Sequence, residues 1–417
     1  MTSNQSVKQV ETCDQHSQQP RQILWPIPAP QERYSCHDIR TENLKRCVTC
    51  DDDWSRSSQS GPGKEGDKVF ENGRKNGPIK GTCEDMCPAK EAHLRRTNKL
   101  VDKLEMGQES GVNTPNPRRM VKKFLNSTFK VDGMDSHDVR TPSTLLATTK
   151  YLITRIADDP EVDFSRSYEF ICDRLRGVRQ DLMIQDIHDE TRIQILEYCT
   201  TFHLYASYEL HNCPPQVYDD HLNGKFLREC FGQLLSSYAE LKVITCRRIL
   251  MESAFLLMDF GSAEALDRYR YLPNSVRKNK TYQLCQRLNF LAFSGNYHCI
   301  LHSLENLHSL LKIAMNLRLP TVMELYFRAL CHGFNSSGGK FPLEKLVEIL
   351  IPYNKDRDNS LEWIKEAVIN TRAEIDEEHL RFQKNNYTSD HKIPRRKWKS
   401  IDDEIVEPKI MGLLWVN

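Results

Sequence analysis

The chain has 417 residues, of which 39% are hydrophobic and 28% charged, and its formal net charge at pH 7 is +1. This length is enough for two or three domains with separate cores, and the balanced charge excludes a global basic field. No apolar run approaches the ~20 residues of a membrane-spanning helix, and the N-terminus lacks the segments of a secretory signal. We therefore expect an intracellular protein with no membrane partner.

Residues 1–80 are rich in Gln, Ser, Pro, Gly and charged residues and show no sustained hydrophobic periodicity. The stretch DDDWSRSSQSGPGKEGDK, from Asp51 to Lys68, is typical of chain that cannot offset the entropy of ordering by burial. The composition therefore predicts a disordered N-terminal leader over residues 1–80.

After the leader the pattern becomes helical. Pro88 suits a first helical turn, with Asp85 as its cap. Residues 107–117 contain Gly and Pro and are expected to form a linker. A second helix is expected to begin with Thr141 as N-cap and Pro142 at its first position.

The most regular helix is expected from Phe164 to Leu182, where apolar residues recur at intervals of three and four. Further apolar stripes predict a close succession of helices, and SGNYHCIL, from Ser294, is expected to be a corner between two of them. Helix pairs in sequence predict a mainly α protein with a solenoid-like helical repeat domain over residues 81–335.

The C-terminal third has a different pattern. Residues 341–351 and 361–369 are expected to form two short helices, and the alternating segment His379–Asn386 an exposed strand. Helix, turn, helix and strand is the order of a winged helix. A winged-helix subdomain is therefore predicted at residues 336–400, followed by a tail at 401–417.

Several motifs, in this order, resemble one protein family. The motifs are GTCEDMCPAKE from Gly81, MVKKFLNSTF from Met120, DVRTPSTLLATTKYL from Asp138, EFICDRLRGVRQDLMIQD from Glu169, FHLYAS from Phe202 and SGNYHCIL from Ser294. Together they resemble the SAC/GANP family over roughly residues 80–400. The resemblance implies a helical-repeat layer that ends in a PCI-type winged helix.

In that family the winged helix pairs with a second PCI-domain protein, a small acidic protein binds this partner, and the pair presents a basic surface to nucleic acid. The resemblance implies a non-catalytic scaffold subunit of nuclear mRNA export or transcription-coupled mRNA processing, located in the nucleus or the cytoplasm.

The leader has no Phe-Gly repeats, and no centrin-binding helix is recognised before Asn417. The chain therefore resembles the short branch of the family that carries the SAC domain alone. Members of that branch are linked to the centrosome and spindle. The alternative function is thus an interaction protein that acts there in mitosis without binding RNA.

Fourteen cysteines lie at irregular spacing, and several fall within apolar helical stripes. This usage is typical of buried reduced thiols rather than a disulfide framework. Cys47, Cys50, Cys83 and Cys87 could together supply four thiolates to zinc, but the low-complexity segment between the two pairs favours structural or free thiols. Neither a metal nor a cofactor is therefore predicted.

Motifs of catalysis are absent from the sequence. It contains no phosphate-binding loop, no nucleophile elbow and no zinc-protease motif. No strand–helix alternation surrounds the cysteine pairs, which disfavours a redox site. The protein is therefore not expected to be an enzyme.

Three arginines of the helix from Phe164 to Leu182 are candidate contacts for a partner protein or RNA: Arg174, Arg176 and Arg179. Arginines at the edge of an apolar stripe usually brace neighbouring helices by pairing with acids. For Arg174 and Arg179, bracing through Asp173, Asp181 or other acids is the preferred interpretation.

The segment HKIPRRKWKS, from His391 to Ser400, has five basic residues, one tryptophan and no acid. Basic side chains neutralise phosphate, and an indole stacks on an unpaired base. The candidate nucleic-acid contacts are therefore Arg395, Arg396, Lys397, Trp398 and Lys399. Two alternatives stay open: the basic residues pair with the acidic segment Asp402–Glu407, or Trp398 docks the tail onto the domain.

The predicted contact with a PCI-type partner is formed by the winged-helix helices and the strand around Phe382. An exposed strand edge beside apolar helix surface suits augmentation by another chain. The alternative is an isolated wing whose edge faces solvent.

Overall fold

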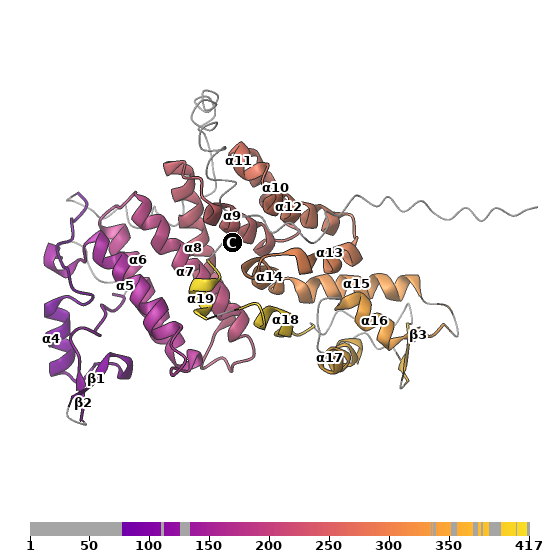
Figure 1. Ribbon diagram of the computed structural model, residues 1–417, viewed down its shortest axis with the longest axis horizontal. Helices are drawn as coiled ribbons and strands as arrows, with labels where there is room; N and C mark the ends of the chain where they lie inside the picture. The colour runs from indigo at the N-terminus through magenta and orange to yellow at the C-terminus, as the bar shows by residue number, and fades with distance from the viewer. Residues whose placement is uncertain are drawn as a thin grey trace, which may run out of the picture. The chain divides into compact units, whose positions relative to one another are not determined.

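The structure, a computed structural model, describes residues 77–109, 112–125, 134–334, 336, 339–351, 357–369, 374–376, 378–382, 393–405 and 407–414. The described chain is mainly helical (Figure 1), which confirms the mainly α class expected from the periodicity. All but four residues of the predicted leader, residues 1–76, lie outside the described residues.

The described chain begins with a short helix and a hairpin. Helix α4 spans Ala89–Thr97 and the 3-10 turn η2 spans Lys103–Glu105. Strand β1, Met106–Glu109, then pairs antiparallel with β2, Val112–Pro115.

Two predictions are wrong in this region. The N-cap of α4 is Pro88 and has no side-chain hydrogen bond, so Asp85 does not cap the helix. The segment expected to be a linker forms most of the β1–β2 hairpin. Gly107 is tightly packed, because a Cβ there would lie 3.1 Å from the Asn116 side chain, and Pro115 ends β2.

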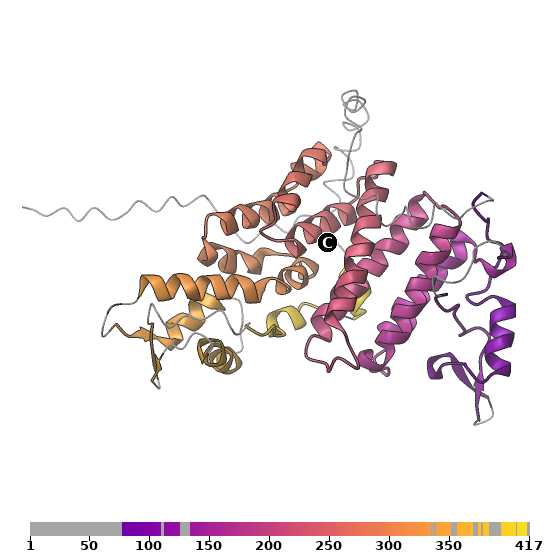
Figure 2. The same cartoon turned by 180° about the vertical axis from the view of Figure 1, so that it is seen from behind.

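The next helices follow with short connections and lie side by side in Figures 1 and 2. After η3 (Ser136–Asp138) they are α5 (Pro142–Tyr151), which continues into η4 (Leu152–Ala157), α6 (Phe164–Ile184), α7 (Glu190–Glu209) and α8 (Asp220–Leu241).

The start of α5 and the extent of α6 agree with the sequence analysis. Thr141 Oγ1 accepts a hydrogen bond from the Thr144 amide at 3.3 Å, and Pro142 is the first helical residue. In α6 the apolar stripe faces the core, with Ile171, Leu175 and Val178 fully buried.

Helix α9 (Cys246–Met258) packs against α12 (Lys280–Phe293) and α14 (Ser309–Asn316). The other elements of this region are α10 (Ala263–Asp267), η5 (Arg268–Tyr271), α11 (Asn274–Arg277), α13 (Tyr297–Ser303), η6 (Leu304–Asn306) and α15 (Leu319–Gly333). The expected corner lies between α12 and α13: Gly295 has φ +69°, and Asn296 Oδ1 accepts from the Cys299 amide at 3.1 Å.

The C-terminal part combines two helices with a small sheet. The elements in chain order are β3 (Phe341–Pro342), α16 (Leu343–Leu350), α17 (Arg357–Ile369), β4 (Glu374–Ile375) and β5 (His379–Arg381). The sheet is antiparallel in the order β3-β5-β4, and Leu380 in the central strand pairs with both Phe341 and Ile375. Two short helices follow, α18 (Lys399–Asp402) and α19 (Lys409–Gly412).

A single hydrophobic cluster extends from α5 through α19 and contains most of the described cysteines. Cys199, Cys230, Cys285 and Cys331 are buried as expected, whereas Cys299 is only half-buried. Burial raises the pKa of Cys285 to about 12, so this thiol stays protonated. None of the described helices is long and apolar enough to cross a membrane.

Candidate functional site

Two of the three candidate arginines on α6 are buried and ion-paired inside the chain. The Arg174 guanidinium lies 3.4 Å from Glu105 of η2, pairs with Asp173 and sits over the Phe170 ring. Arg179 Nη2 lies 3.1 Å from Glu229 on α8, and its Nε donates to Gln233.

Arg176 is half-buried, and its guanidinium lies between two aromatic rings. The distances to the ring centroids are 3.9 Å for Phe124 and 4.7 Å for Phe226. Such cation–π contacts attract the guanidinium to both rings. All three arginines thus make the contacts expected of bracing residues.

The entrance segment before α5 is fixed to α6 through two fully buried carboxylates. Glu105 receives Arg95 and Arg174, and its Oε1 accepts from the Val121 amide at 2.9 Å. Asp181 on α6 receives Lys122 Nζ at 2.7 Å and Arg140 Nε at 2.8 Å. A buried carboxylate requires such partners, because removing one leaves an uncompensated charge.

The cysteines of the entrance have separate surroundings. Cys83 is buried beside Arg140, with its backbone bridged to that residue, and Cys87 lies 3.9 Å from Arg95 Nη1. Burial raises the pKa of Cys87 to about 12, which disfavours the thiolate that zinc requires. Cys47 and Cys50 lie outside the described residues. In the part of the chain that is described, no group of three or more His, Cys, Asp or Glu side chains could hold a metal ion.

The basic tail residues pair with acids of three helices. Arg395 Nη2 lies 2.5 Å from Asp220 of α8, and Lys397 Nζ lies 2.6 Å from Glu209 of α7. Arg396 pairs with Glu366 of α17. The alternative of pairing with residues 402–407 is therefore wrong for these three side chains. Lys399 is exposed.

Trp398 docks the tail and is not available to a nucleic acid. Only 4% of its surface is exposed, and its ring meets Trp363 of α17 edge to face at 5.6 Å. Its backbone amide donates to the Tyr208 hydroxyl on α7 at 2.8 Å. The prediction that this indole stacks on a base is wrong, because both its faces lie in the core.

Residues 393–405 and 407–414, here named the C-terminal strap, make further contacts with the helices after Trp398. Glu404 lies 2.5 Å from Lys312 Nζ of α14. Asp158, which follows η4, accepts from the Ile410 amide at 2.9 Å at the start of α19. The strap thus joins α17 to α7, α8 and α14.

Phe382 does not form an exposed contact surface, contrary to the prediction. It is 3% exposed and packs edge to face against Phe341 at 5.9 Å. Phe341 in turn packs against Phe334 at 5.1 Å, and Phe334, which follows α15, is 51% exposed. The sequence pattern places Phe382 in a strand but does not show which face of that strand is covered.

The turn between β4 and β5 is acidic in its described part, with Asp376 and Glu378. Lys340 Nζ lies 3.0 Å from Asp376 and lowers the pKa of that carboxyl to about 2. These carboxylates would repel phosphate, so the turn itself does not suit nucleic acid.

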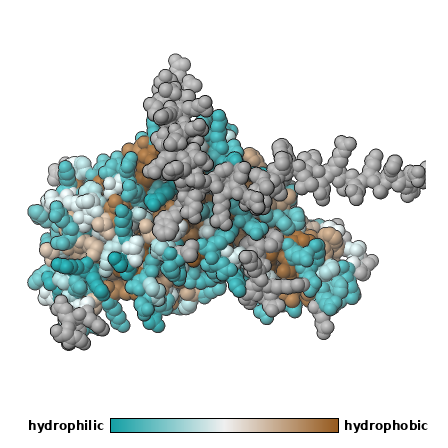
Figure 3. Space-filling view, viewed as in Figure 1, coloured by the Kyte–Doolittle hydropathy of each residue, from teal (hydrophilic) through white to brown (hydrophobic). Residues whose placement is uncertain are grey.

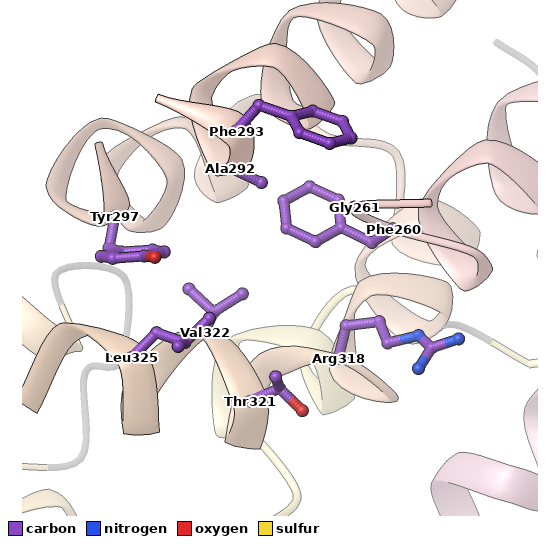
Figure 4. A pocket seen from close by; sticks show the side chains of 9 residues that line it. All are labelled: Phe260, Gly261, Ala292, Phe293, Tyr297, Arg318, Thr321, Val322 and Leu325. Carbon is purple, nitrogen blue, oxygen red and sulfur yellow. The ribbon is translucent and has the colours of Figure 1, made fainter. Parts of the chain in front are cut away.

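A groove that the sequence analysis missed lies between the end of α12 and the start of α15, with a cavity volume of about 270 Å³ (Figure 4). Its lining is formed by Phe260, Gly261, Ala292, Phe293, Tyr297, Arg318, Thr321, Val322 and Leu325. Both flanking helices are amphipathic, but periodicity cannot reveal which apolar residues remain uncovered in the fold.

The chain is similar in sequence to known proteins. The family model described as "SAC3/GANP family" matches residues 86–371, more than half of the chain. The chain is 27% identical over 235 residues to Protein xmas of Drosophila melanogaster, which covers 52% of this chain and 11% of that protein.

Two further relatives carry the family name. SAC3 family protein 1 of Schizosaccharomyces pombe is 25% identical over 248 residues, 56% of this chain and 24% of that protein. SAC3 family protein B of Arabidopsis thaliana is 26% identical over 174 residues, 40% of this chain and 10% of that protein. The chain thus spans less than a quarter of the length of each of these relatives. From the extent of the family match, the chain belongs to the SAC3/GANP family.

Proposed function

We propose that this protein is a non-catalytic scaffold subunit of nuclear mRNA export or transcription-coupled mRNA processing, and that it pairs with a PCI-type partner through a winged helix at residues 341–382. One observation carries the proposal. Elements β3, α16, α17, β4 and β5 follow in the winged-helix order, and the three strands form one antiparallel sheet. Membership of the SAC3/GANP family supports a scaffold role.

The proposed partner surface lies beside the two outer strands of this sheet. Pro342 in β3 has no amide hydrogen to donate, so a strand of another chain is less able to pair with the sheet at that edge. The exposed Phe334 ring stands beside β3 and offers an aromatic anchor of the kind that dominates binding energy at interfaces. Apolar surface also gathers over α15 and α16 (Figure 3).

The proposed nucleic-acid contact includes fewer residues than the five tail candidates named from the sequence. Trp398 is excluded by its burial, and Arg395 is largely covered. The contact would be made by the exposed residues Lys397 and Lys399 together with the half-buried Arg396. Because the chain alone offers only these cations to phosphate, we propose that the paired complex binds nucleic acid more tightly than the chain alone. A small acidic protein bound to the partner would complete the assembly.

Quantitative affinity purification followed by mass spectrometry tests the pairing. Three tagged forms are compared: the wild type, Phe334→Ser and Leu94→Ser. Leu94 on α4 is 58% exposed and serves as a matched control. We expect a PCI-domain protein at near-equal stoichiometry with the wild type and the control, and about tenfold less with Phe334→Ser. Recovery of centrosomal or spindle proteins without a PCI-domain protein would support the mitotic alternative instead.

A further inference from the structure

We infer that the groove between α12 and α15 binds an acidic amphipathic helix of another protein, with one aromatic or branched aliphatic side chain inserted as an anchor. The inference is independent of the winged helix and of the pairing proposed for it. Three observations carry it: the uncovered apolar surface, the shape of the groove and the charge of its rim.

The apolar surface is unusually open for the body of a helical layer. Two lining residues, Phe293 at the end of α12 and Leu325 on α15, are 58% and 36% exposed, and Phe290, one turn before Phe293, is 56% exposed. Single exposed apolar residues are ordinary, but a group of them on facing helices marks an interaction site. Ordered water against these rings would be released when a partner covers them.

The groove has the form of a pocket for one anchor side chain. Figure 4 shows the Phe260 ring at its centre, with Ala292 and Phe293 on one side and Val322 and Leu325 of α15 on the other. Its cavity volume of about 270 Å³ is small for a cofactor and sufficient for one large side chain. Helix-in-groove binding uses such pockets for apolar residues that recur at intervals of three and four.

Among the residues that line the groove, Arg318 is the one that carries a charge. Arg318 lies at one end, where its Nε donates to the Met258 carbonyl and its Nη2 is 3.8 Å from Asp259. The two flanking helices also carry the exposed residues Arg287 on α12 and Arg328 on α15. The chain has no Asp or Glu from Lys280 to Ser303, and Glu324 is the single acid within α15.

This charge distribution selects the kind of partner. Arg318 stands at the N-terminus of α15, where the helix dipole also favours an anion. Because Asp259 lies as far as 3.8 Å from Nη2, the guanidinium can also donate hydrogen bonds to a carboxylate of the partner. A helix with an apolar face flanked by Asp or Glu therefore complements the groove, whereas a basic helix would face like charges.

Selection from a random-peptide phage library on the immobilised full-length chain tests this inference. We expect enriched sequences with a Phe, Trp, Leu or Ile anchor and net negative charge. A synthetic copy of the most enriched peptide, followed by fluorescence anisotropy, should bind about tenfold more weakly to Leu325→Asp and to Phe293→Ser, and about fivefold more weakly to Arg318→Glu.

Leu222→Asp on α8 is the matched control, because Leu222 is 45% exposed and far from the groove in the chain. The melting temperature of each variant should stay within about 2 °C of the wild type, because the changed side chains are largely at the surface. If Leu325→Asp unfolds the chain, Phe293→Ser decides the matter.

Three outcomes would overturn the inference. The first is enrichment of peptides that bind the groove variants as well as the wild type. The second is a basic consensus. The third is a doubling of mass in sedimentation equilibrium that Leu325→Asp abolishes, because the occupant would then be a second copy of this chain. None of these outcomes bears on the Phe334 test of the winged-helix pairing.

Discussion

His203 on α7 is a single residue whose protonation the fold opposes. Its side chain is fully buried beside Phe202 and Phe226, and its Nδ1 lies 2.7 Å from Asn223 Oδ1. Burial is the main cause that lowers its pKa to about 3, and the nearby Arg179 and Arg176 lower it further. The folded chain therefore keeps this imidazole neutral.

The depressed pKa predicts a loss of stability in mild acid. Below about pH 6.5 the unfolded chain binds a proton that the folded chain does not, so the free energy of unfolding falls as pH decreases towards 3. Between pH 7 and pH 5 this single group should remove about 2 kcal/mol. Urea unfolding of the wild type and His203→Gln at both pH values measures the difference. An equal loss in both proteins would contradict the assignment.

Lys399 is an exposed cation of the tail. Replacing it by Ala should lower the slope of log affinity against log salt by about one for a fluorescent single-stranded RNA, because one phosphate contact is lost. Anisotropy titrations of the paired complex at several salt concentrations measure this slope. Lys80→Ala, another exposed lysine, is the control and should leave it unchanged; an unchanged slope for Lys399→Ala would count against the proposed contact.

Among the elements, the C-terminal strap joins parts that are distant in sequence, and Trp398 is its anchor between α17 and α7. Trp398→Ala should lower the free energy of unfolding by about 3–5 kcal/mol, because it removes a fully buried aromatic and leaves a cavity. Circular dichroism during urea unfolding measures this change. Lys399→Ala, one residue away and exposed, should alter stability by less than about 0.5 kcal/mol. Equal effects of the two changes would show that the strap is not anchored through Trp398.

Elements with strong local signals were predictable from the sequence. The side chains of Thr141 and Pro142 themselves favour the start of α5. The Ser-Gly-Asn sequence at 294–296 likewise favours the corner between α12 and α13. The β1–β2 hairpin was missed because its strands have four residues each and contain the Gly and Pro that suggest a loop.

The candidate site was harder to predict, because its residues are decided by distant contacts. Arg395 meets Asp220, which is 175 positions away, and Trp398 meets Tyr208, which is 190 positions away. A basic segment with one tryptophan is typical of a nucleic-acid contact when only neighbours in sequence are considered. The same residues become docking residues once three helices supply acids and an aromatic pocket.

For the whole molecule, the net charge of +1 agrees with a fold in which many basic side chains pair with acidic side chains of the same chain. Several cations that suggested nucleic-acid binding are balanced by internal acids, such as Arg174 by Glu105 and Arg396 by Glu366. By contrast, Phe334 and several apolar residues of the α12–α15 groove remain exposed to solvent. This combination favours a protein that works by assembling with other proteins and contacts nucleic acid as part of a complex.

The most direct measurement of the central claim is isothermal titration calorimetry of the purified chain with the PCI-domain protein recovered by affinity purification. The proposed pairing predicts a 1:1 complex and a dissociation constant that rises about tenfold with Phe334→Ser, with no change for Leu94→Ser. Two results would contradict pairing through the winged helix: affinity purification that recovers no PCI-domain protein, or equal dissociation constants for the wild type and Phe334→Ser.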